Sequence, residues 1–127
     1  NFDEPKCLEL LSNSTTTLAI HGSNEIEPLV YIGGQDSQMI NHIIDIFKKH
    51  DLDKYISPIV RDIQGLSKNN IVNKNAIKAG VQFEFSYGMR KMMFENVDKA
   101  KGRINKTPFF WKIVHSIRES LTKQIFN

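Results

Sequence analysis

The run "GVQFEFSYGMRKMM" at residues 80–93 constrains the fold more than any other stretch of this chain. Apolar and polar residues alternate through positions 81–86, and a period of two is typical of a β-strand with one apolar face. Glu84 then lies on the opposite face from the apolar side chains. In a sheet that is covered on both faces, a carboxylate in that position is costly unless it has a partner or a function.

The segments around this strand predict alternating strands and helices. Strand-like runs occur at 16–22 and 28–34, and helical patterns occur at 3–11, 35–50, 89–97 and from 107 to the end of the chain. Asp3 is a candidate cap for the first helix. Residues 51–80 read as a long, partly ordered connection with a possible short strand at 70–72. We therefore predict an α/β fold with a mixed or mostly parallel sheet flanked by helices, in a single domain over residues 1–127.

Charge is distributed unevenly along the chain. Residues 1–60 carry 4 Lys/Arg and 9 Asp/Glu, a net charge of −5, whereas residues 61–127 carry 13 and 5, a net charge of +8. A basic half favours an anionic partner, although many basic surfaces are simply solvated. The single cysteine, Cys7, excludes an internal disulfide and a Cys-rich zinc site. No run is apolar enough to span a membrane, and the acidic residues 1–10 give no reason to expect that this stretch is a signal peptide.

Two residues are candidates for chemistry. His21 ends a predicted strand, and Glu84 lies within a later one. On one sheet, a histidine and a glutamate could act as a zinc ligand and a general base. Each also has a structural explanation, because His21 could simply end a strand and Glu84 could pair with Arg90 or a lysine. The other histidines are weaker candidates, and His42 in particular is expected to be exposed.

Five segments together resemble a known family. "FDEP", "LAIHG", "VYIGGQD", "NIVNKN" and "GVQFEFSYGMR" follow one another from about residue 2 to residue 95. As a set they resemble the phage-type poly-γ-glutamate hydrolases, a family that also includes phage-related bacillus proteins assigned to replication. The family is similar to zinc carboxypeptidases in fold and chemistry. The resemblance implies a zinc-dependent hydrolase that cleaves the γ-glutamyl peptide bonds of poly-γ-glutamate, an anionic polymer.

The resemblance also implies roles for particular residues. His21 matches a zinc-binding histidine of the family, and Glu84 matches the acidic residue expected to act as general base. Arg90 closes the same motif and would hold a substrate carboxylate, because arginine binds carboxylates through two parallel hydrogen bonds. Asn73 and Lys74 match a substrate-binding Asn followed by a basic residue.

The chain also departs from the family pattern. The family's first zinc element, an "HGGGIE"-like segment that supplies a His and a Glu, has no match here, and Glu25 and Glu27 are poor substitutes for it. We therefore expect the chain to correspond to the C-terminal two-thirds of a family domain, N-terminally incomplete, and to bind zinc weakly through one retained ligand. A phage-related hydrolase is expected in the cytoplasm or released on host lysis.

Two alternatives to a hydrolase remain open at this point. The chain could be a non-catalytic family remnant, or a basic module that binds nucleic acid or another polyanion. Nucleic acid is the weaker choice of partner, because no aromatic–basic stacking pattern or recognition helix stands out.

Overall fold

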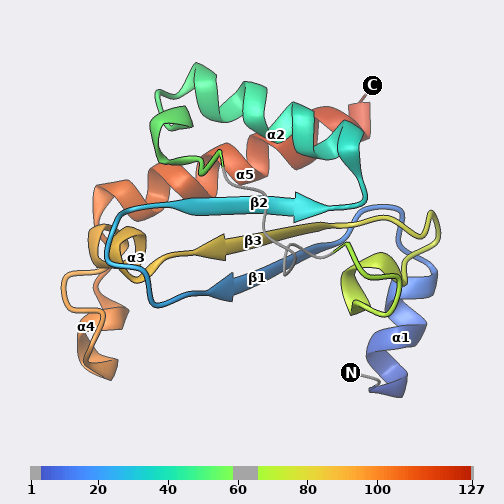
Figure 1. Cartoon of the computed structure of the whole chain (residues 1–127), viewed down its shortest axis with the longest axis horizontal. Coiled ribbons are helices and arrows are strands. Elements are labelled where there is room, and N and C mark those ends of the chain that lie inside the picture. The colour runs from blue at the N-terminus through green and yellow to red at the C-terminus, as the bar shows by residue number, and fades with distance from the viewer. Residues whose placement is uncertain (1–3, 59–65, 127) are drawn as a thin grey trace.

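The computed structural model describes residues 4–58 and 66–126 as a mixed α/β fold (Figure 1). The elements in chain order are α1 (Pro5–Ser12), β1 (Leu18–Gly22), β2 (Val30–Gly34), α2 (Ser37–Lys49), the 3-10 helices η1 (Asp53–Tyr55) and η2 (Ile71–Asn73), β3 (Val81–Phe85), α3 (Tyr87–Met93), α4 (Ala100–Ile104) and α5 (Pro108–Phe126). Among these residues, no helix is both long and apolar enough to cross a bilayer.

The described strands form one sheet in the order β1-β3-β2. β3 is the central strand, and it pairs parallel with β1 and antiparallel with β2. The predicted α/β class with a mixed sheet is therefore confirmed. The sheet leaves β1 at one edge and β2 at the other, and an isolated bridge between Val30 and Ile56 adds to the β2 edge.

The hydrophobic core lies between one face of the sheet and the helices α2 and α5 (Figure 1). Phe83 is fully buried at its centre, where its ring lies 6.4 Å from that of Phe47 on α2 and 5.8 Å from that of Phe85. The period-two pattern of β3 thus predicted its inward face. The apolar stripe of α2 was predicted equally well, since Met39, Ile43 and Phe47 are all fully buried.

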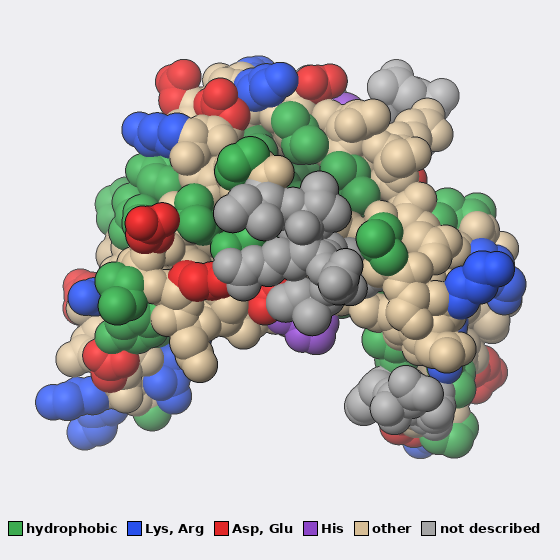
Figure 2. Space-filling model, in the orientation of Figure 1, with side chains coloured by type: hydrophobic (Ala, Val, Ile, Leu, Met, Phe, Trp, Pro, Cys, Tyr) green, Lys and Arg blue, Asp and Glu red, His purple; other side chains and the backbone are tan. Residues whose placement is uncertain are grey.

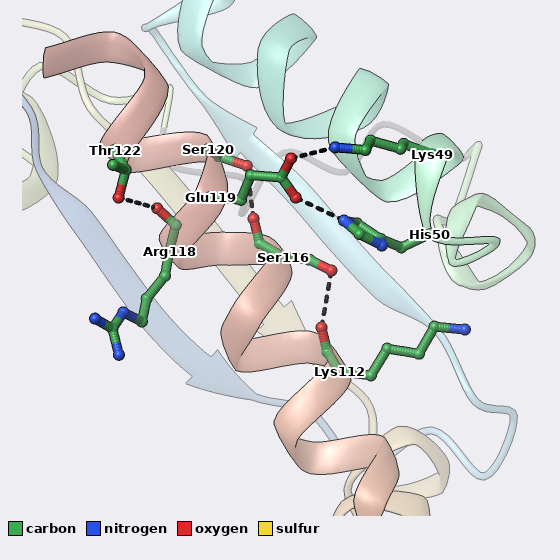
Figure 3. Close-up of polar contacts among 8 residues, drawn as sticks. All are labelled: Lys49, His50, Lys112, Ser116, Arg118, Glu119, Ser120 and Thr122. Carbon is green, nitrogen blue, oxygen red and sulfur yellow. Dashed lines mark hydrogen bonds and ion pairs between the residues drawn. The ribbon is translucent and has the colours of Figure 1, made fainter. Parts of the chain in front are cut away.

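Polar contacts connect the C-terminal end of α2 to α5 (Figure 3). Lys49 and His50 both bind the carboxylate of Glu119, and the distance from His50 Nε2 to Glu119 Oε2 is 2.6 Å. Within α5, the hydroxyls of Ser116 and Ser120 donate back to carbonyls four residues earlier. These bonds satisfy buried hydroxyls on the side of α5 that packs against the rest of the protein.

Several local predictions need correction. The helix α1 is capped by the Glu4 side chain, which accepts from the N–H of Cys7, while Asp3 lies outside the described residues. The segment 70–72 forms no strand: η2 occupies it, because the Asn70 side chain accepts from the N–H of Val72 and closes a turn. His42 is partly buried rather than exposed. The short helix α4 was not predicted.

Candidate functional site

The register of the sheet brings His21 and Glu84 side by side. His21 on β1 is the direct partner of Glu84 on β3, and Tyr31 on β2 is the partner of Glu84 on its other side. Directly paired residues in neighbouring strands point to the same face, so the three side chains form a row across the sheet. This row lies on the face opposite the hydrophobic core, because Phe83 and Phe85 alternate with Glu84.

Burial differs sharply along this row. Tyr31 is 2% exposed, Glu84 is partly buried, and His21 is exposed on the edge strand. The Oε2 atom of Glu84 is shielded from solvent and accepts no hydrogen bond among the described residues. A buried carboxylate oxygen without a donor is costly, and such groups are concentrated at functional sites.

A second carboxylate is held close to the row by hydrogen bonds. The Tyr31 hydroxyl donates to Oε1 of Glu25 over 3.2 Å, and the Ser23 hydroxyl donates to Oε2 of the same carboxylate. Glu25 and Ser23 lie in the turn that leaves β1. The sequence pattern did not predict this role for Glu25, which depends on Tyr31 reaching it from the neighbouring segment of chain.

Arg90 on α3 lies at the end of β1, on the side of the sheet that faces the helices. Its Nη2 donates to the carbonyl of Ser23 over 2.8 Å, and a Cβ at Gly22 would lie 3.2 Å from its Cζ. Gly22 alternates with His21, so its Cβ would point to the core side. Arg90 also lies 6.0 Å from the centre of the Tyr87 ring. It therefore supports the end of β1 and does not lie in the row of His21 and Glu84.

A groove of roughly 440 Å³ opens beside Arg90. Besides Arg90, His21 and Gly22, it is lined by apolar residues of β1, β3, α3 and α5: Ile20, Phe85, Met93, Phe94, Phe110, Ile113, Val114 and Ile117. Tyr87, whose ring lies near Arg90, donates a hydrogen bond from its hydroxyl to Asp98, and this bond raises the pKa of Tyr87 above its ordinary value. The lining of the groove is thus mostly apolar and includes the Arg90 side chain.

Asn73 and Lys74 lie in the segment that precedes β3. Asn73 is 3% exposed, its Oδ1 accepts from the N–H of Gly80, and its Nδ2 donates to the carbonyl of Ser67, both over 3.0 Å. Lys74 follows η2 and is partly buried. The Asn73 amide thus stabilises the loop that leads into β3, and its side chain is buried and not at the surface.

The described residues do not assemble a complete metal site. No group of three or more His, Cys, Asp or Glu side chains in the described part of the chain is arranged to hold a metal ion. A catalytic zinc ion normally takes three protein ligands, and here His21 is the one imidazole beside the Glu84 carboxylate. The donors of these residues alone therefore do not fit a catalytic zinc ion.

Comparison with known proteins identifies relatives of this chain. It is 25% identical over 126 residues to the SPbeta prophage-derived UPF0714 protein YoqZ of Bacillus subtilis, covering 99% of this chain and 46% of YoqZ. It is 28% identical over 94 residues to the UPF0714 protein YndL of the same bacterium, covering 74% of this chain and 37% of YndL. The chain thus spans less than half the length of these curated relatives.

Two solved structures share the fold. The structure of a bacteriophage poly-gamma-glutamate hydrolase superposes with a TM-score of 0.87 at 26% identity, covering 98% of this chain and 60% of the hydrolase. A zinc-free structure of YndL superposes with a TM-score of 0.85 at 23% identity, covering 97% of this chain and 61% of YndL.

The family model described as poly-gamma-glutamate hydrolase matches residues 1–116. That range contains all the strands and the row formed by His21, Glu84 and Tyr31. The chain therefore belongs to the poly-gamma-glutamate hydrolase family.

Proposed function

We propose that this chain acts in the hydrolysis of γ-glutamyl bonds of poly-γ-glutamate, with Glu84 as the general base. The observation that carries the proposal is the pairing of His21 with Glu84 across two parallel strands, together with the Glu84 Oε2 atom that no described donor satisfies. The bacteriophage hydrolase that shares the fold supports the substrate.

The chemistry assigned to Glu84 is proton transfer. Its carboxylate takes a proton from the water that attacks the γ-glutamyl carbonyl carbon, and returns it to the leaving nitrogen as the C–N bond breaks. Glu84 is partly buried on the central strand, between β1 and β2. Glu25, fixed by Tyr31 and Ser23, adds negative charge beside the row.

Zinc enters the proposal through His21. Within a site completed by further ligands, His21 would be one zinc ligand, and the metal would supply a bound water of lowered pKa. The zinc-free form reported for YndL is consistent with a family that binds zinc. Because the ligands of the described residues are incomplete, no step above is assigned to the metal.

Substrate binding is proposed for the basic part of the chain. Poly-γ-glutamate carries one carboxylate per residue, and the net charge of +8 over residues 61–127 attracts such a polymer. Three exposed lysines of this part of the chain are available for the contact: Lys91 on α3, and Lys99 and Lys101 at the start of α4. Arg90, Lys74 and Asn73 remain proposals as substrate-binding residues, and of these Asn73 needs its loop to rearrange before it meets the polymer.

The test separates cleavage from binding. We would incubate the chain and its Glu84→Gln variant with poly-γ-glutamate and zinc chloride, following chain length by gel filtration and binding by fluorescence anisotropy of a labelled polymer. The amide keeps the shape of Glu84 but cannot accept the proton, so cleavage should fall roughly 100- to 10,000-fold while binding persists. Glu95→Gln is the matched control, because it removes the same charge from an exposed position.

Each outcome decides between the candidate functions. Cleavage by Glu84→Gln at close to the wild-type rate would place the general base elsewhere. Salt-sensitive binding with no cleavage by the wild-type chain would favour the second candidate, a polyanion-binding protein without catalytic activity. The basic second half of the chain is the observation that supports this alternative.

A further inference from the structure

A basic arm projects from the protein between α3 and α5. We call residues 94–107 the α4 arm, because a β-bridge between Phe94 and Lys106 closes its base and the short helix α4 lies within it. In Figure 1 the arm extends past the ends of β1 and β3, and Figure 2 shows Lys and Arg side chains gathered at its outer end. The arm is therefore a charged protrusion at the end of the sheet where β1 and β3 stop.

Backbone contacts hold the α4 arm in a defined conformation. At its base, the N–H of Glu95 donates to the carbonyl of Asn105 over 3.0 Å. Further out, Gly102 packs so tightly that a Cβ at this position would lie 2.2 Å from the carbonyl oxygen of Asn96. The arm thus presents its side chains from a backbone that is already ordered, so little chain entropy is lost when a ligand binds to it.

The cations of the α4 arm outnumber its acids and are not neutralised. Residues 95–106 carry 4 Lys/Arg and 2 Asp/Glu, a net charge of +2, and one of the acids, Asp98, accepts from the Tyr87 hydroxyl. Within the described residues, no Lys or Arg of the arm forms an ion pair with a carboxylate. The exposed cations are Lys99, Lys101, Arg103 and Lys106 on the arm and Lys91 beside it, over the Tyr87 ring. Like charges that are gathered without partners repel one another, and an anionic ligand relieves that repulsion.

The side chains of the arm fit a chain of carboxylates better than a nucleic acid. Proteins that bind single-stranded nucleic acid combine basic residues with aromatic rings on which the bases stack, and residues 95–106 contain no aromatic residue. Arginine is the residue that recognises phosphate through two parallel bonds, but the Nη1 of Arg103 already donates to the carbonyl of Val97 over 2.9 Å. The lysines that remain are flexible point charges, which suit a flexible polymer with one carboxylate on each residue.

We propose that the α4 arm, together with Lys91, is a second binding site for the poly-γ-glutamate chain, outside the row of reacting residues. His21 and Glu84 are each the second-last residue of their strands, so the row lies close to the strand ends past which the arm extends. One polymer chain contacts the arm while another of its bonds lies at Glu84. The choice of this polymer rests on the proposed function. The consequence is a preference for long chains, because binding to the arm raises the effective concentration of the polymer at the row.

The binding of poly-γ-glutamate chains of different lengths tests this proposal. We would measure fluorescence anisotropy of a labelled short oligomer and a labelled long polymer with the Glu84→Gln variant, so that no bond is cleaved during the measurement. Affinities expressed per glutamate residue remove the statistical advantage of the long chain. We expect the long polymer to bind at least about tenfold more tightly per residue than the oligomer, and its affinity to fall steeply as the salt concentration rises.

Matched variants locate the contact. Lys99→Gln combined with Lys101→Gln removes two charges from the arm, and it should lower the affinity for the long polymer about tenfold and reduce its salt dependence. Both side chains are exposed and Lys99 makes no capping bond to α4, so this double variant should fold, which circular dichroism would verify. Lys6→Gln combined with Lys48→Gln is the control. It removes the same charge from exposed positions on α1 and α2, and it should change the affinity less than about twofold, because salt screens distant charges.

Three results would overturn the proposal. One is an affinity per residue that does not change with the length of the polymer, and another is equal weakening by the two double variants. A third is single-stranded DNA that binds more tightly than poly-γ-glutamate and is released by the arm substitutions, since the arm would then be a nucleic-acid surface.

Cleavage is a separate measurement, which distinguishes a failure of this inference from a failure of the proposed function. A wild-type chain that cleaves no polymer, yet binds the long polymer through Lys99 and Lys101, would refute the hydrolytic role of Glu84 and support the arm as a binding site.

Discussion

Replacing Asn73 with alanine distinguishes the structural role of its amide from the substrate-binding role that the family resemblance implies. In the folded chain, Asn73 is 3% exposed, and its Oδ1 accepts from the N–H of Gly80 over 3.0 Å. Its Nδ2 donates to the carbonyl of Ser67. That carbonyl also accepts from the N–H of Asn70, so it still has a partner after Asn73 is replaced. Of these two bonds, the one that the variant leaves without a replacement is the bond from the buried Gly80 N–H.

The expected loss of stability follows from leaving the Gly80 N–H without its acceptor. Leaving one buried N–H without an acceptor costs about 1–3 kcal/mol, with the lower end applying where a water enters the space of the lost amide. We therefore expect a loss of about 2 kcal/mol in the free energy of unfolding.

Urea unfolding followed by circular dichroism measures this loss. With a slope of about 2 kcal/mol per molar urea, the midpoint should fall by about 1 M while the slope stays constant. Asn69→Ala is the control, because Asn69 lies in the same segment but is exposed, and it should shift the midpoint little. If Asn73→Ala is as stable as the wild type and instead binds poly-γ-glutamate more weakly, the structural account is refuted and Asn73 belongs to the substrate site.

Three further outcomes are expected. Calorimetric titration of the chain alone should show weak zinc binding that His21→Ala removes, and tight stoichiometric binding would mean that the chain already contains a complete ligand set. Gly88→Ala should destabilise the chain by about 1–3 kcal/mol in thermal unfolding, because its Cβ would lie 1.9 Å from the carbonyl oxygen of Ile26; an unchanged midpoint would contradict this packing. The hydrogen bond to Asp98 raises the pKa of Tyr87 in the folded chain. It therefore stabilises the fold at pH values below the ordinary pKa of tyrosine, and this contribution is lost as the pH rises through the raised pKa. An absorbance titration should therefore show a lower pKa for this tyrosine in Asp98→Asn, and no change would argue against the hydrogen bond.

The local elements could be predicted from the sequence wherever one physical signal dominated. The alternation at 81–86 specified both the strand and its buried face, because burying Phe83 and Phe85 together requires a period of two. The stripe that includes Met39 and Ile43 specified α2 in the same way. For the segment that forms η2, the sequence suggested a short strand, and the structure has a 3-10 turn instead. The turn forms because the Asn70 side chain accepts from the N–H of Val72, which a strand would use for pairing.

The pairing of His21 with Glu84, the candidate site residues, shows what the sequence could not predict. His21 and Glu84 could each be selected as a residue suited to catalysis, yet they are 63 positions apart and have no local relation in the chain. Their proximity depends on which strands pair and in what register, and a shift of one residue would turn Glu84 to the opposite face. The parallel pairing of β1 with β3 brings them together, and long-range packing of the core decides that pairing.

Tertiary structure alone also revealed two features that no local pattern encodes. The Glu25 carboxylate is held beside the row because the hydroxyls of Tyr31 and Ser23 both donate to it, a contact that its sequence context does not predict. Ile20 follows the same apolar pattern as the buried core residues, but it is exposed because the helices do not extend over β1. The sequence by itself determined which faces are apolar, while the placement of the helices on the sheet decided which of those faces is covered. Burial depends on that placement because it is a property of neighbouring elements and not of the residue alone.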